Sequence, residues 1–150
     1  MDKEEKANPI YAKVTVELNL THEAIVNILS NGFFVGCTGF DDVDYDHTEY
    51  GKAKKALIAE GFKDLCLEDV QAKMLAMGYS LKLHMLGEPG NKEWYELTLD
   101  KLVRGIEKYA EEPVNGSVMD VLGGDPNANL DAIDYDTILQ YACFGKVLIG

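Results

Sequence analysis

Basic residues are scarce in this sequence. Lys and Arg number 14 against 26 Asp and Glu, which gives a formal net charge of −12, and Arg104 is the single arginine. Proteins that bind DNA or RNA concentrate Lys and Arg to neutralise phosphates. An anionic membrane surface attracts the same two residue types. We therefore expect the chain to bind neither nucleic acid nor membranes directly.

Long apolar runs are missing as well. No stretch approaches the roughly 20 apolar residues of a membrane-spanning helix, and the opening MDKEEK holds no apolar core of a signal peptide. The apolar share of 47% and the charged share of 27% are those of an ordinary soluble protein. We expect a cytoplasmic protein with one domain over residues 1–150, a flexible start at 1–9 and a long loop at 112–130.

Cysteine is also rare, at three residues, and no two of them stand in a zinc-type pair. Cys66 and Cys143 have apolar neighbours, which is typical of thiols that pack as small hydrophobes. Cys37 lies in a glycine-rich stretch and is the one candidate nucleophile, but a thiolate needs a neighbouring base. The sequence therefore predicts no disulfides and a reducing compartment.

Known motifs for metals, nucleotides and nucleophiles are absent. Asp42, Asp44 and Asp46 imitate the start of a calcium loop, yet His47 stands where the loop requires Gly and Ala53 where it requires Glu. No phosphate-binding glycine loop and no GxSxG motif occurs. We expect no cofactor, no metal and no catalytic residues.

Apolar spacing and turn residues predict an α+β fold, with a small, mainly antiparallel sheet and about five helices packed on one face. The clearest sheet element is a hairpin of residues 79–86 and 94–97 around the turn Gly87–Asn91. Clean alternation from Ile10 to Leu18 predicts a half-buried strand. The stretch 33–40 suits a short strand or a packed loop, and residues 146–149 are prone to form a strand. Helices are expected at 21–31, 48–59, 67–77, 98–110 and 135–144.

Acidic residues gather in two segments, near 41–49 and near 131–136. If both lie on one exposed face, their field steers a basic partner; the alternative is two solvated loops that cap helices and aid solubility. His47 beside Asp46 is a weak candidate for a general base. The candidate partner-binding residues are Asp41, Asp42, Asp44, Asp46, Glu49, Asp131, Asp134 and Asp136.

The C-terminal half carries the segments YELTLDKLVRGI and DTILQYACFGKVLIG. In these segments the chain resembles a family of small uncharacterised proteins from bacteriophages and prophages, except that Lys146 stands where an acid is expected. The resemblance covers about 30 residues closely. It implies a phage origin, a similar fold and the cytoplasm of a bacterial host, and it supplies no catalytic residues.

Three hypotheses follow. The first is a phage-encoded, non-enzymatic acidic protein that inhibits a host defence system of the CRISPR or restriction type, by nucleic-acid mimicry, through the basic surface of a nucleic-acid-binding protein. The second is a binder that sequesters a nucleotide immune signal with Lys52, Lys54, Lys55 and Arg104. The third is an enzyme that uses His47 or Cys37.

Overall fold

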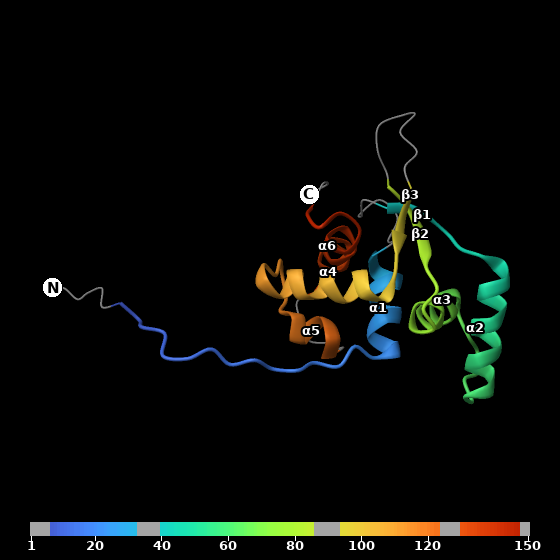
Figure 1. The fold of residues 1–150 in the computed structure, drawn as a ribbon, viewed down its shortest axis with the longest axis horizontal. Coiled ribbons are helices and arrows are strands. Elements are labelled where there is room, and N and C mark those ends of the chain that lie inside the picture. Colours follow the sequence, from blue (N-terminus) through green and yellow to red (C-terminus); the bar gives the residue numbers. More distant parts are fainter. Residues whose placement is uncertain (1–6, 33–39, 86–93, 124–129, 148–150) are drawn as a thin grey trace.

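The computed structural model describes residues 7–32, 40–85, 94–123 and 130–147. These contain a three-stranded antiparallel sheet and six helices, so the predicted α+β class is confirmed (Figure 1). Within the described ranges, no helix is both long and apolar enough to cross a membrane. In chain order the elements are α1 (His22–Gly32), β1 (Phe40–Asp44), α2 (His47–Ala59), α3 (Leu67–Ala76), β2 (Leu81–Met85), β3 (Trp94–Leu97), α4 (Leu99–Glu111), α5 (Val118–Gly123) and α6 (Ala132–Phe144).

The sheet has the strand order β1-β2-β3, with both neighbouring pairs antiparallel. Leu81 pairs with Leu97 and His84 with Trp94, so the predicted hairpin is confirmed, while its turn at Gly87–Asn91 lies outside the described residues. A bulge in β1 makes Asp41 the extra residue between the pairs Phe40–Met85 and Asp42–His84.

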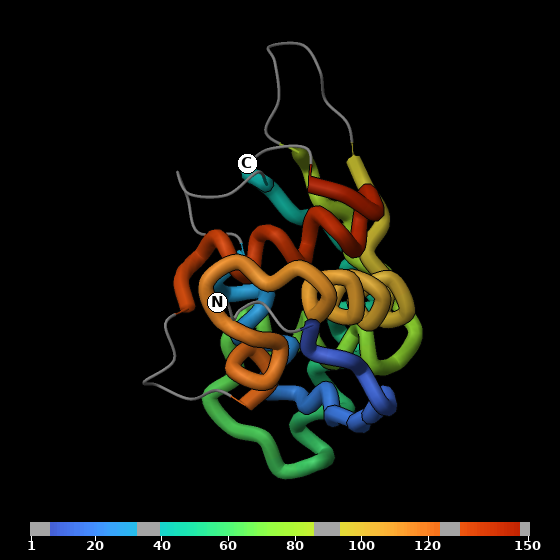
Figure 2. The backbone as a smooth tube through the Cα atoms, turned by 90° about the vertical axis from the view of Figure 1, so that its left-hand side faces the viewer, coloured from blue at the N-terminus to red at the C-terminus, as the bar shows by residue number. Residues whose placement is uncertain are grey.

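Helix α6 is the central helix of the fold. It contacts both α1 and α4 along its length, and its C-terminal end reaches the strands (Figure 2). Phe144 places its ring 5.8 Å from that of Phe40 and 4.5 Å from that of Tyr95. Most residues of α6 are buried, because other helices cover α6 on more than one side.

Local capping sets most helix ends. Thr21 and Thr98 accept hydrogen bonds from the first turns of α1 and α4, as their sequences predict. Gly145 ends α6 in the left-handed conformation, which glycine adopts without strain. The helix expected at 135–144 begins earlier, at Ala132, because Asp131 is the N-cap and Asp134 completes its capping box.

The predicted strand from Ile10 to Leu18 is wrong. Residues 7–20 form neither helix nor strand, and Ile10, Val14 and Val16 expose 81%, 87% and 67% of their surface. Alternation establishes which side chains share a face, but a strand also needs an edge with which to pair. Among the described residues, none pairs with this segment.

Two smaller expectations also fail. The 112–130 loop contains the short helix α5. Cys66 does not pack as a hydrophobe: it is exposed at the N-cap of α3, and its Sγ lies 3.1 Å from an oxygen of Asp69. Most of the possible strand at 33–40 and the end of the one at 146–149 lie outside the described residues.

Candidate functional site

The outer side of the sheet is solvent-exposed and polar. Cross-strand pairing places two rows of side chains there, and we call these six residues the open sheet face. One row is Asp44, Lys82 and Glu96, and the other is Asp42, His84 and Trp94. The opposite side carries Leu81, Leu83 and Leu97, which are fully buried.

His84 of β2 contacts an acidic residue of the neighbouring strand β1. Its Nδ1 lies 2.5 Å from Oδ1 of Asp41, so the bulged residue of β1 binds the neighbouring strand through its side chain. The imidazole also lies 5.0 Å from the indole of Trp94. Alternation along β2 places His84 on the same face as Lys82, whereas its partners Asp41 and Trp94 lie on other strands and have no local sequence signal.

The first acidic segment continues from β1 into the start of α2. Asp46 caps α2 by accepting the backbone N–H of Glu49 at 2.9 Å. Asp42 and Asp44 each accept the backbone N–H of the residue that follows them. Each of these bonds uses one carboxylate oxygen of an exposed side chain. Four exposed carboxylates therefore remain, with the half-buried Glu49 beside them. We call this group the acidic segment: Asp41, Asp42, Asp44, Asp46 and Glu49.

The second predicted acidic segment does not form a surface. Asp134 has no exposed area and Asp136 is 6% exposed, so the expectation that both face a partner is wrong. Asp134 accepts hydrogen bonds from the hydroxyl of Tyr109 at 2.6 Å and from the backbone N–H groups of Asn115 and Asp131, both at 2.9 Å. Asp136 accepts from Nε2 of Gln140 at 2.7 Å. Both carboxylates stabilise the fold rather than a complex.

Tyr109 and Asp134 form a buried hydrogen-bonded pair between α4 and α6. Burial alone raises the pKa of Asp134, but hydrogen bonds from Tyr109, Asp131 and Asn115 together outweigh burial and lower that pKa. Burial and the adjacent carboxylate raise the pKa of Tyr109. Both groups therefore keep their ordinary neutral-pH states, with Asp134 ionised and the tyrosine protonated.

Asp131 is exposed but is distant from the acidic segment. It lies at the N-terminus of α6, and the C-terminal residue Phe144 packs against Phe40 of β1. A 13-residue helix is roughly 20 Å long. The two predicted acidic clusters therefore lie at opposite ends of α6 and make no common surface.

The basic residues proposed for a nucleotide pocket are also separated. Lys52, Lys54 and Lys55 are exposed on α2, whereas Arg104 lies on α4. Arg104 instead lines a hollow of about 310 Å³ with Lys101, Lys108 and the C-terminal end of α6. These three cations stand at positions 101, 104 and 108, a spacing that places them on one face of a helix. That spacing is the sequence signal that could have predicted a basic hollow here.

The residues of the enzyme hypothesis do not form a catalytic arrangement among the described residues. His47 is exposed at the start of α2, with its ring 5.4 Å from that of Tyr45, while Asp46 is engaged in capping. Cys37 lies outside the described residues. In the part of the chain that the structure describes, no three His, Cys, Asp or Glu side chains gather as a metal site.

Comparisons with known proteins give no match. Neither a family model, nor a curated protein sequence, nor a solved structure is similar to this chain. The resemblance of the two C-terminal segments to phage proteins therefore stays a prediction. The surfaces of the protein are therefore the evidence for its function.

Proposed function

We propose that this protein is a non-enzymatic binding protein that recognises a basic protein surface through the acidic segment. The observation that carries the proposal is the exposure of Asp41, Asp42, Asp44 and Asp46 along β1 and at the start of α2. No Lys or Arg interrupts residues 41–49. Carboxylates presented on a strand and a capped helix are held in place before binding, so little ordering cost opposes the complex.

The partner that fits the acidic segment is a protein surface that ordinarily binds nucleic acid. A surface that binds nucleic acid is rich in Lys and Arg, and the acidic segment is complementary to it in charge. Together with the net charge of −12 and the phage origin that the C-terminal segments predict, this supports inhibition of a host nucleic-acid-binding defence protein. The mimic is smaller than the sequence predicts, because Asp131, Asp134 and Asp136 do not contribute to it.

The first test neutralises the acidic segment. In bacteria with an active CRISPR or restriction system, expression of the wild-type protein should raise the plating efficiency of a phage that the system targets. The variant Asp42→Asn/Asp44→Asn should protect the phage less well, because exposed charge pairs contribute about 0.2–1 kcal/mol each, so that losing two weakens binding roughly two- to thirtyfold. Asn retains the side-chain oxygen that accepts the next backbone N–H in each case.

The matched control is Glu107→Gln/Glu111→Gln, which removes the same charge from exposed positions of α4. It should protect the phage as well as the wild type does, and both variants should melt at the wild-type temperature. Full protection by the Asp42/Asp44 variant would show that the acidic segment is not the binding surface. No protection by the wild-type protein against either system would reject the defence partner.

The hollow beside α4 favours a second candidate function, the binding of a small anionic ligand. Lys101, Arg104 and Lys108 all line it. Calorimetry with ATP and cyclic di-AMP tests this candidate: Arg104→Gln should weaken binding about tenfold, because a charged hydrogen bond contributes about 1.5–3 kcal/mol. Lys54→Gln, which removes an equal charge from α2, should not weaken it. No heat with either nucleotide would reject this candidate.

A further inference from the structure

Residues 7–20, which we call the N-terminal arm, leave the body of the protein as an extended segment (Figure 1). Even-numbered positions from 10 to 20 are apolar throughout, while the polar side chains stand at odd ones. Val14 is 87% exposed, Val16 67% and Leu18 41%, so the exposure of the apolar side falls toward the body. An extended segment with this alternation can become a strand when a second strand pairs with it.

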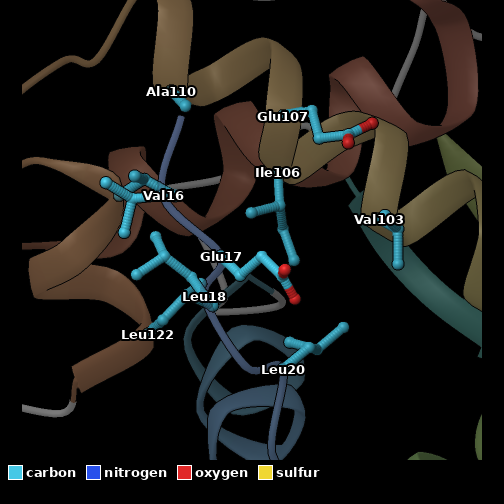
Figure 3. Close-up of a pocket in the computed structure, with 10 residues that line it drawn as sticks. Val16, Glu17, Leu18, Leu20, Val103, Ile106, Glu107, Ala110 and Leu122 are labelled. Atoms are coloured by element: carbon cyan, nitrogen blue, oxygen red, sulfur yellow. The ribbon is translucent and has the colours of Figure 1, made fainter. Parts of the chain in front are cut away.

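The base of the arm lies along an unfilled apolar groove of about 410 Å³ (Figure 3). The arm contributes Val16, Leu18 and Leu20 to its lining, together with Glu17. Helices α4 and α5 contribute the facing residues, which are apolar except for Glu107: Val103, Ile106, Glu107, Ala110, Val118 and Leu122. The arm thus covers the groove without filling it, and further apolar side chains have room beside these three residues.

We propose that the arms of two copies of this chain pair as an antiparallel β-ribbon around a two-fold axis through Thr15. This register places Lys13 of each chain opposite Glu17 of the other, twice per dimer. On the apolar side it places Val14 opposite Val16, and Ala12 opposite Leu18. Two-fold axes at Lys13 or at Glu17 would instead set like charges against each other, which destabilises a cross-strand pair.

The same register fills the groove. It brings Ile10 of the second copy beside Leu20, and Ala12 beside Leu18, where the groove has free volume. This matters because a two-stranded ribbon alone is only marginally stable in water and needs its apolar side covered. Groove and ribbon together satisfy that requirement.

The charge of the arm is compatible with a second copy as the occupant. Lys13 and Glu17 are the only charged residues of the arm, so the arm is neutral in a chain of net charge −12. Two such chains repel each other over most of their surfaces. The neutral arms allow two bodies to associate without bringing their acidic segments together.

The first experiment is a charge-swap cycle read by analytical ultracentrifugation across a concentration series. Lys13→Glu and Glu17→Lys should each raise the dimer dissociation constant about tenfold, because each introduces two like-charge pairs. Lys13→Glu/Glu17→Lys restores both opposite-charge pairs and should recover nearly the wild-type constant. Lys52→Glu changes an exposed residue of α2 by the same charge and serves as the control.

A wild-type protein that sediments only as a monomer, or a double variant as weak as the single ones, would overturn the proposal. The arm lies outside the buried core. All variants should therefore keep the wild-type circular dichroism spectrum, and lost pairing is not confused with unfolding.

The second experiment tests the axis by disulfide trapping. Thr15→Cys places two thiols directly opposite each other, where the Cα separation of an antiparallel pair, about 4.5–5.5 Å, suits a disulfide. Under mild oxidation this variant should form a covalent dimer. In Tyr11→Cys the two thiols lie eight residues apart along the ribbon, roughly 27 Å, and should not cross-link. Equal cross-linking of both variants would exclude the Thr15 axis.

Discussion

Asp134 shows how the surroundings of a single residue decide its role. The carboxylate is fully buried, yet both of its oxygens accept hydrogen bonds from groups within the fold. It joins the start of α6 to Tyr109 of α4 and to Asn115 in the loop that follows α4. One ionised side chain thus fixes three segments relative to one another.

Removing this carboxylate should be costly. Asp134→Ala is expected to lower the free energy of unfolding by about 3 kcal/mol, because it leaves several buried donors without acceptors. Tyr109→Phe removes one of these bonds, and we expect it to cost about 1 kcal/mol. Urea denaturation followed by circular dichroism measures both variants. Equal losses from the two would contradict the assignment of Asp134 as the shared acceptor.

The stability that the Asp134 carboxylate contributes depends on pH, and the pKa of Asp134 sets the direction of that dependence. The folded-state pKa of Asp134 is lowered, so its ionised form is preferred in the folded protein. Its stabilisation is complete above the unfolded-state pKa, about 3.9, and is lost as the pH falls through the lower folded-state pKa. The stability gap between wild type and Asp134→Ala should therefore shrink in acid. A gap that stays constant down to denaturation would contradict the lowered pKa.

Among the elements, the contact of α4 with α6 depends on one glycine. A Cβ added at Gly105 would lie 2.6 Å from the carbonyl oxygen of Ile138 and 2.8 Å from the backbone nitrogen of Ala142. Backbone atoms of a buried helix cannot move aside cheaply. The absence of a side chain at Gly105 therefore sets how closely the two helices approach.

Alanine substitutions at two glycines should change the free energy of unfolding in opposite directions. Gly105→Ala should lower the free energy of unfolding by about 2 kcal/mol through overpacking. Gly51→Ala, in α2, meets nothing within 4 Å and should raise it by about 0.5–1 kcal/mol, because alanine loses less entropy in a helix. Thermal melts of both variants measure the effect. Stabilisation by Gly105→Ala would refute close packing of α4 on α6.

In the whole molecule, the two proposed binding surfaces lie in different places. The acidic segment lies on β1 and the start of α2, while the N-terminal arm runs beside α4 and α5. Salt separates the two proposals, because exposed charges are screened within about 8 Å at physiological ionic strength. Binding through the acidic segment should weaken steeply as salt rises. The largely apolar pairing of the arms should change much less.

Local chemistry explains what could be predicted from the chain. Thr21 and Thr98 cap their helices through bonds that span three residues, and Gly145 ends a helix through its own backbone. The hairpin of β2 and β3 likewise joins neighbouring segments. Interactions of this range are encoded in adjacent residues, so composition and spacing reveal them.

Long-range contacts decided the rest. Asp134 resembles an exposed acid in the sequence, but Tyr109, 25 residues away, makes it a buried acceptor. Asp41 meets His84 across 43 residues, and the strand-like arm finds no partner edge among the described residues. The sequence specifies which residues share a helix or strand face, since backbone geometry is local. Which face becomes buried depends on what packs against it, and only the folded chain determines that.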